Sequence, residues 1–250
     1  MCTVLLLHRP GDAWPVLAGA NRDERIGRAF LPPARHWPDL PHVVGGLDVA
    51  AGGSWFGVND AGVLATIVNG FDRLGPLPGK RSRGELVLRA LRERDAASAA
   101  RAVAALGAER YRGFTLVLAD RRDAFAVRSD ERAIAVDALA PGHHVVTPDG
   151  VDVPESPRFA AHFDAFRGAA PPDPERGDWS AWERLLRVVD EDDPHRAMTV
   201  VTPHAFGTVC SALAAIPAPR DAAARLRFAN GPPTDAPYEP VEEAPCASPA

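Results

Sequence analysis

The first 24 residues, MCTVLLLHRPGDAWPVLAGANRDE (residues 1–24), contain the pattern from which the fold and the function follow. TVLLLH (3–8) and PVLAGAN (15–21) are short apolar runs typical of strands, and RPGDAW (9–14) between them is rich in turn formers. These runs predict an antiparallel hairpin. Such pairing returns the end of the second strand to the start of the first, so residues 21–24 are expected beside Cys2.

Cys2 directly follows the initiator methionine, and a small second residue permits removal of that methionine. Removal would leave Cys2 with its own free α-amine. An α-amine titrates near ~8 and a thiol near ~8.5, so an N-terminal cysteine carries its own base and needs little help to form a nucleophilic thiolate. The alternative is that Cys2 occupies this position by chance, as one of the three cysteines of the chain.

The residues expected near Cys2 suit catalysis of acyl transfer. Arg22 would lower the pKa of the thiol, Asp23 would hold the α-amine, and Asn21 would donate to a substrate oxygen. Asn69 ends a strand of a second predicted hairpin and is a neutral donor suited to an oxyanion hole. Asn21, Glu24 and Trp55 form the predicted substrate-binding set. Taken alone, NRDE (21–24) is equally a polar turn at a strand end, and the tryptophans are equally core or lid residues.

Composition limits the possible functions. The chain of 250 residues has a formal charge of −5 and no concentrated basic stripe, which argues against nucleic-acid binding. No basic leader and no apolar run of the ~18 residues needed to span a membrane is found. The cysteines show no CxxC spacing, so a reducing cytoplasm is predicted, and the eight histidines show no metal-binding spacing. The bias toward arginine, with Lys80 as the only lysine, is typical of a GC-rich bacterial genome.

The remaining chain predicts strands and helices in an irregular order. Strands are expected around NDAG (59–62), in a meander of four runs from 114 to 147, and in two final runs at 208–216 and 224–231. Ser82 and Glu85 form a capping-box pattern, so a helix is expected to begin there, and a second helix is expected from residue 96 to Gly107. Two further helices are expected over 156–166 and over 180–191, the latter with a Ser180–Glu183 capping box. The Pro-rich segment 31–41 is expected to be a surface loop.

This order favours layered α+β packing over a regular βαβ alternation. A chain of this length fits one large domain, predicted over residues 1–230. From Gly231 to residue 250 the sequence is Pro-rich and acidic without a basic residue, which predicts a disordered tail.

Over roughly residues 1–90 the sequence resembles the NRDE family, which is the family of the transport and Golgi organisation protein 2. The resemblance lies in the stretches MCT, GANRDE, GGSWFGVNDAGVLATIVNG and SRGELV. Ser54 takes the place of the family's threonine. That family resembles N-terminal-nucleophile hydrolases of the penicillin V acylase and bile salt hydrolase group. The resemblance implies a four-layer αββα sandwich of mainly antiparallel sheets. It also implies cleavage of a small non-peptide C–N bond, with Cys2 as nucleophile, Asp23 as acidic partner of the amine, and Asn69 as oxyanion-hole donor.

The C-terminal half departs from the family pattern. Thr147 and Pro148 stand where Ser-Asn is usual, and Val209 and Cys210 stand where the family has Arg-Ser. In the hydrolases these regions contribute a second asparagine and an arginine near the substrate.

The family is also linked to intracellular haem movement, so a rival hypothesis is a non-catalytic haem carrier using the same cleft, with a histidine or Cys210 as axial ligand. A scaffold role for the tail is a third hypothesis. No cofactor or metal is required by the hydrolase hypothesis, and the oligomeric state is left open.

Overall fold

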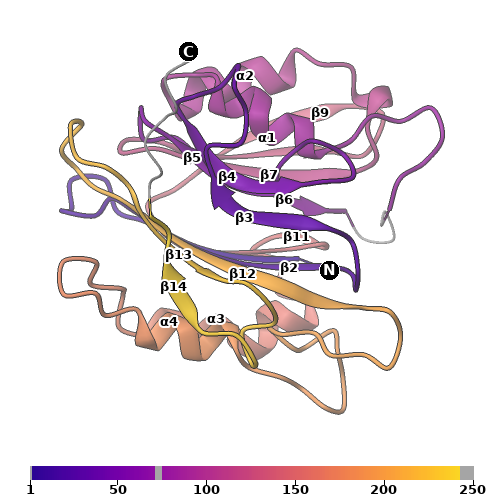
Figure 1. Ribbon diagram of the computed structural model, residues 1–250, viewed down its shortest axis with the longest axis vertical. Helices are drawn as coiled ribbons and strands as arrows, with labels where there is room; N and C mark the ends of the chain where they lie inside the picture. Colours follow the sequence, from indigo (N-terminus) through magenta and orange to yellow (C-terminus); the bar gives the residue numbers. More distant parts are fainter. Residues whose placement is uncertain (1, 71–74, 243–250) are drawn as a thin grey trace.

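Two antiparallel sheets stack face to face, and helices cover the outer face of each (Figure 1). This arrangement is seen in a computed structural model that describes residues 2–70 and 75–242. The layer order is helices, sheet, sheet, helices, as the family resemblance implied. In the described residues, no helix is both long and apolar enough to cross a bilayer.

The first sheet has seven strands in the described chain, in the order β11-β10-β1-β2-β12-β13-β14. These strands are β1 (Thr3–His8), β2 (Val16–Arg25), β10 (Gly142–Thr147), β11 (Gly150–Val151), β12 (Phe206–Ile216), β13 (Arg225–Ala229) and β14 (Tyr238–Pro240). The hairpin of β1 and β2 is confirmed, and Thr3 lies opposite Asn21. Because β2 continues to Arg25, the NRDE residues belong to the strand and do not form a turn.

The second sheet follows chain order and is also seven-stranded where described. It contains β3 (Phe30–Ala34), β4 (Val43–Asp48), β5 (Phe56–Asn59), β6 (Leu64–Asn69), β7 (Phe114–Ala119), β8 (Ala124–Ser129) and β9 (Ile134–Leu139). The hairpin around NDAG is confirmed as β5 and β6, with Gly62 in the left-handed region at φ +82°. Glycine has no Cβ and adopts that conformation without strain.

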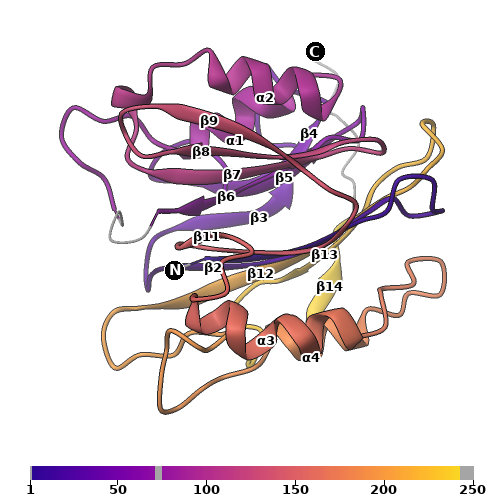
Figure 2. The same ribbon diagram turned by 180° about the vertical axis from the view of Figure 1, so that it is seen from behind.

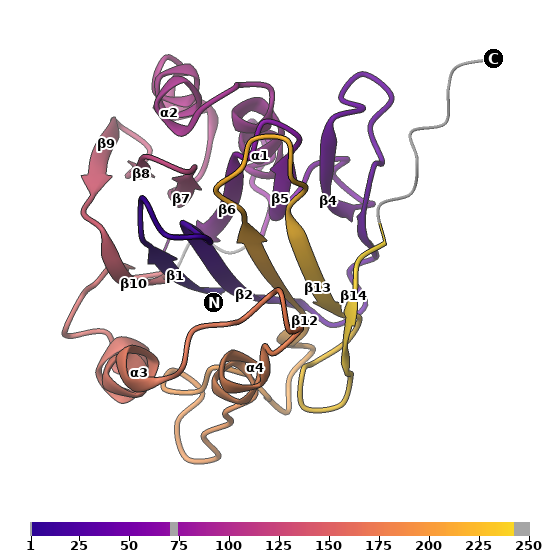
Figure 3. The same cartoon turned by 90° about the vertical axis from the view of Figure 1, so that its left-hand side faces the viewer.

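Helices α1 (Gly84–Leu91) and α2 (Ala96–Ala104) lie on the second sheet, and α3 (Pro157–Gly168) and α4 (Ser180–Leu186) lie on the first (Figures 2 and 3). Both sheets are therefore covered on two faces, and β1 is buried throughout. Val4 and Leu6 of β1 belong to the core between the sheets, whereas Leu5 and Leu7 pack toward α3 and α4. This alternation of side chains along a strand also divides the residues near Cys2.

Four local predictions differ from the structure. Part of the Pro-rich segment predicted as a loop forms β3, which begins at Phe30. It is an edge strand with an irregular register. Proline is tolerated there because an edge strand does not need every backbone N–H to donate to a neighbouring strand. Helix α1 begins at Gly84, whose N–H donates to the Ser82 hydroxyl. Helix α2 ends at Ala104, short of Gly107.

Ser180 does not cap α4. It is the first residue of the helix, its N–H donates to Asp178, and the helix ends at Leu186, short of the predicted residue 191.

The predicted four-stranded meander divides between the two sheets. β7, β8 and β9 pair consecutively, but β10 crosses to the first sheet and pairs with β1. The sequence showed four strands in succession and did not indicate which sheet the last one joins. The crossing brings the segment after β10, including α3, to the side of β1 and β2 that carries Asp23.

The predicted disordered tail is wrong for residues 231–242. Tyr238 lies on β14, is buried, and donates its hydroxyl hydrogen to Ser211. A buried aromatic ring with a satisfied hydroxyl anchors this segment, although the surrounding composition is polar and Pro-rich. The rest of the predicted tail, 243–250, lies outside the described residues.

Candidate active site

The hairpin of β1 and β2 places Cys2 against the NRDE segment. Cys2 precedes β1 directly, and the Thr3–Asn21 pairing makes Arg22 its cross-strand neighbour. The Cys2 Sγ atom lies 3.7 Å from the backbone oxygen of Asp23. The side chain is 8% exposed and reaches the wall of a cavity. The proximity expected from the hairpin is confirmed.

That cavity has a volume of about 300 Å³ and lies at the end of the interface between the sheets. Of the seven predicted site residues, six line it: Cys2, Arg22, Asp23, Glu24, Trp55 and Asn69. They come from the start of β1, the end of β2, the segment before β5 and the end of β6. The other described residues of the lining are Arg28, Asp48, Ala51, Ser54, Ile67, Gly75, Pro76, Leu77, Lys80, Arg81, Ser82, Arg83, Gly84 and Arg112.

Asn21 lies on the opposite face of the sheet. Its amide nitrogen donates to the backbone oxygens of Leu186, at 2.9 Å, and Met198, at 2.8 Å. Both hydrogens of the amide are therefore used to tie β2 to the helical layer. The predicted donation from Asn21 to a substrate is wrong, because strand alternation turns its side chain away from the cavity.

Arg22 extends between the two sheets. Its Nη2 donates to Asp48 Oδ2 at 2.7 Å, and its guanidinium carbon lies 4.2 Å from the centre of the Trp55 ring. This cation–π contact and the charge-assisted hydrogen bond hold the guanidinium group in one orientation. Arg28 donates to the same carboxylate oxygen, also at 2.7 Å.

Asp23 points to the helical side of the sheet and is fully enclosed. Thr208 donates its hydroxyl hydrogen to Asp23 Oδ1 at 2.5 Å, and Arg158 Nη1 lies 3.7 Å from Oδ2. Arg158 also donates to the Thr3 hydroxyl. Burial raises the pKa of the Asp23 carboxyl, and the positive charge of Arg158 opposes that rise. Burial likewise lowers the pKa of Arg158.

Burial of the Cys2 thiol disfavours a preformed thiolate. It raises the pKa of the thiol above the usual range for cysteine, and the positive charge of Arg22 offsets only part of that rise. Arg22 thus lowers the pKa of the thiol, as predicted, but the effect of burial is larger. A buried, protonated thiol needs a base before it can attack a carbonyl carbon.

Asn69 ends β6 at the cavity wall, opposite Phe114 of β7. In the part of the chain that the structure describes, no hydrogen bond of its side-chain amide is seen. The amide is therefore available as a donor toward the cavity. A neutral amide at the wall of this cavity is the type of donor that an oxyanion hole uses.

Several polar residues of the site were missed by reasoning from the sequence, among them Asp48 and Arg112 of the cavity lining. Arg158 comes from the first turn of α3, and Thr208 comes from β12, where a register shift around Val209 aligns Thr208 with Asp23 and Cys210 with Arg22. Arg83 was part of the motif SRGELV, but no role was assigned to it. A charged residue directly after a helix-starting proline, as in SPRF (156–159), was the one signal for Arg158.

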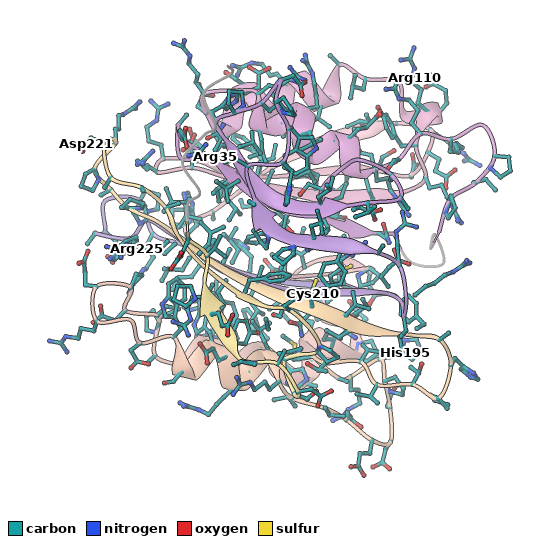
Figure 4. All side chains as sticks on the ribbon, in the orientation of Figure 1. Arg35, Arg110, His195, Cys210, Asp221 and Arg225 are labelled. Carbon is teal, nitrogen blue, oxygen red and sulfur yellow. The ribbon has the colours of Figure 1, made fainter. Side chains whose placement is uncertain are left out.

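Thr147 and Pro148, two of the departures from the family pattern, are not among the described residues that line the cavity beside Cys2. Thr147 and Pro148 line a second cavity, of about 350 Å³, together with Arg158 and His195. Cys210, labelled in Figure 4, lies on β12 in the interior and is 0% exposed. Its burial raises the pKa of its thiol.

Among the described residues, the lining of the cavity contains one side chain of the type that ligates haem iron, the Cys2 thiol. No histidine is among the described residues of its lining, and among the described residues no group of three metal-ligating side chains is found.

Gly46 makes the position of Trp55 possible. A Cβ atom on Gly46 would clash with the Trp55 ring. We expect Gly46→Ala to push the ring from under Arg22 and to lower the free energy of unfolding by about 1–3 kcal/mol, measured by urea denaturation. Gly168→Ala is the control, because nothing lies within 4 Å of the added methyl group. Equal stability of the two variants would contradict this packing argument.

The chain matches the sequence pattern of one protein family, Transport and Golgi organisation 2, over residues 1–210. It belongs to that family. The match covers the β1–β2 hairpin, both sheets up to Cys210 of β12, and every residue predicted for the site. Among curated proteins, none matches this member of the Transport and Golgi organisation 2 family in sequence.

Solved structures of N-terminal-nucleophile hydrolases share the fold of this Transport and Golgi organisation 2 protein. The N-acylethanolamine-hydrolyzing acid amidase orthologue of Caenorhabditis elegans is 13% identical, with a TM-score of 0.53 over 85% of this chain and 92% of that one. The C2A mutant of the conjugated bile acid hydrolase of Clostridium perfringens is 11% identical, with a TM-score of 0.51 over 100% and 99%. Penicillin V acylase of Agrobacterium tumefaciens is 11% identical, with a TM-score of 0.51 over 93% of each chain. At these identities the likeness establishes the fold alone.

Proposed function

We propose that this protein is a cysteine amidohydrolase that cleaves a small non-peptide C–N bond, with Cys2 as its N-terminal nucleophile. The observation that carries the proposal is the position of the Cys2 Sγ atom. It lies at the wall of an open cavity, 3.7 Å from the Asp23 backbone oxygen, with Arg22 and Asn69 lining the same cavity. Of the proteins named above, whose fold this chain shares, one is an amidase by its printed name, and the others are a hydrolase and an acylase.

The reaction begins with a proton transfer. Once Met1 is removed, the α-amine of Cys2 takes the proton of the thiol, and the sulfur attacks the carbonyl carbon of the amide. This intramolecular base meets the need created by burial, which favours the protonated thiol. Asp23, held by Thr208 and Arg158, positions the charged amine.

The tetrahedral intermediate carries its negative charge on the former carbonyl oxygen, which accepts a hydrogen bond from the Asn69 amide. The C–N bond then breaks as the ammonium group of Cys2 returns its proton to the leaving nitrogen. A thioester remains on Cys2. Water, deprotonated by the same amine, attacks this thioester and releases the carboxylic acid and the free thiol.

The decisive experiment combines intact mass with trapping of the thioester. The purified protein is expected to lack one methionine residue by intact-mass spectrometry. Brief incubation with a panel of N-acyl amides, followed by acid quench, is expected to add an acyl group that maps to the peptide beginning at Cys2. A protein that retains Met1 has no free amine at Cys2 and would overturn the mechanism, as would amide cleavage with the acyl group on another residue.

Haem carriage remains the alternative predicted from the sequence. No contact or lining residue in the described chain specifically favours it, so it is not developed as a second function.

A further inference from the structure

The cavity beside Cys2 has an unequal distribution of charge. Its described lining contains more cationic than acidic side chains. The cationic side chains are Arg22, Arg28, Lys80, Arg81, Arg83 and Arg112, and the acidic ones are Asp23, Glu24 and Asp48. Asp23 is engaged with Arg158 on the other face of the sheet. Lys80 and Arg81 are paired with Glu131 and Glu85, which are not among the described lining residues. Arg22 and Arg28 share Asp48.

One guanidinium nitrogen of Arg22 has no nitrogen or oxygen acceptor among the described residues, and the Cys210 thiol lies beside the guanidinium group. The Nη2 atom of Arg22 donates to Asp48, and Nη1 is the buried nitrogen without such an acceptor. The residue is 4% exposed, so bulk water does not solvate the group well. Because Arg22 lines the cavity, a ligand in the cavity can supply an acceptor to this buried N–H group.

Arg83 and Arg112 are two further arginines of the described lining. Arg83 Nη1 donates to the backbone oxygen of Gly113 at 2.9 Å, and Arg112 Nη1 donates to that of Gly75 at 3.4 Å. Burial, followed by the nearby charge of Arg112, lowers the pKa of Arg83 to about 10. The charges of Arg83 and Arg112 influence each other, and guanidinium groups bind carboxylate and phosphate oxygens in a bidentate manner.

We propose that the cavity binds an anionic group of the substrate, a carboxylate or a phosphate, through Arg22, Arg83 and Arg112. The proposal that the bound anion is part of a substrate rests on the proposed amidohydrolase function. The proposal that the cavity binds an anion does not. The site would select amides that carry such a group near the scissile bond, and uncharged amides of the same size would bind poorly.

Selective alkylation of Cys2 tests the site without any hydrolysis. Iodoacetate and iodoacetamide transfer groups of similar size to sulfur with loss of iodide, and they differ in that iodoacetate is an anion. The rate at Cys2 is followed by peptide mass spectrometry, and the iodoacetate-to-iodoacetamide rate ratio is compared with that of glutathione. We expect this ratio to be at least about tenfold higher at Cys2, since a charge-assisted contact of this kind is worth about one factor of ten or more.

Arg83→Gln and Arg112→Gln should each bring the ratio down toward that of glutathione. Arg89→Gln is the matched control, because Arg89 is an exposed arginine of α1 that does not line the cavity. Inorganic phosphate at millimolar concentration should slow alkylation by iodoacetate in the wild type and in Arg89→Gln. If one variant fails to fold, the other still decides the result.

A ratio at Cys2 equal to that of glutathione would overturn the proposal, and so would an equal fall in all three variants. If Cys2 reacts with neither reagent, the anion site is tested by measuring the thermal unfolding temperature of each variant with and without inorganic phosphate. Stabilisation of the wild type and of Arg89→Gln, but not of Arg83→Gln or Arg112→Gln, supports the anion site, and no stabilisation overturns it. Anion selectivity without hydrolysis of any amide would contradict the proposed enzyme and leave the anion site standing.

Discussion

Replacement of Cys2 by alanine is expected to lower kcat for amide hydrolysis by at least about 10⁴-fold, because alanine offers no nucleophile while the cavity and Asn69 remain. The measurement is release of the free amine from the best substrate of the N-acyl amide panel. KM should change little, since the arginines of the cavity are untouched. Cys2→Ser should retain part of the activity, because a hydroxyl group can still attack with the same amine as base.

Cys210→Ala is the matched control for Cys2→Ala. Cys210 is also buried and faces the region between the sheets, but it does not line the cavity among the described residues. This variant should keep the activity of the wild type apart from a modest loss of stability. Hydrolysis by Cys2→Ala at the wild-type rate would mean that another group is the nucleophile.

Replacement of Arg158 by methionine is expected to lower the free energy of unfolding by about 3–5 kcal/mol, the usual result of leaving a buried charge without its partner. The Arg158 and Asp23 side chains are 2% and 0% exposed, and their closest charged atoms are 3.7 Å apart. Urea denaturation measures the loss. The double variant Asp23→Asn with Arg158→Met should be more stable than Arg158→Met alone, because the orphaned carboxylate is then absent.

The loss of stability in Arg158→Met should also depend on pH. Burial already raises the folded-state pKa of Asp23, and removal of Arg158 raises it further. A carboxyl group with a raised folded pKa binds its proton more tightly in the folded protein. It therefore stabilises the folded state at low pH, and this stabilisation is lost as pH rises through the folded pKa. The stability gap between Arg158→Met and the wild type should widen from acidic to neutral pH.

Arg128→Met provides the control for an exposed ion pair. Arg128 and Asp137 are 50% and 48% exposed, and water screens their attraction. Its loss should change stability by less than about 1 kcal/mol. Equal effects of Arg128→Met and Arg158→Met would show that the Asp23–Arg158 contact is not a buried charge pair in solution.

The sequence by itself determined the part of the site that depends on local pairing. Two short strands joined by a turn of few residues can pair in one way that buries their apolar faces, and that pairing brings Cys2 beside residues 21–24. The same argument holds for the second hairpin, which delivers Asn69. A contact between residues that are close in sequence closes a short loop, which costs little conformational entropy. Sequence patterns over about 20 residues are therefore sufficient to predict such contacts.

The tertiary structure decided which face of β2 meets the cavity. Alternation along the strand predicts that Arg22 and its neighbours point to opposite sides. Only the stacking of the second sheet on one face, with Trp55 beneath Arg22, makes that face the cavity side and leaves Asn21 to the helices. Both faces of β2 are buried, so hydrophobicity could not tell them apart.

The partners from distant segments were likewise set by tertiary structure alone. β10 crosses to pair with β1, β12 pairs with β2 on the other side, and α3 then carries Arg158 to Asp23. Arg83 and Arg112 meet at the cavity because the segments before α1 and before β7 end beside each other. These contacts join positions as far apart as 23 and 208. No periodicity or spacing in the chain encodes such pairings, because they result from the packing of complete sheets and helices.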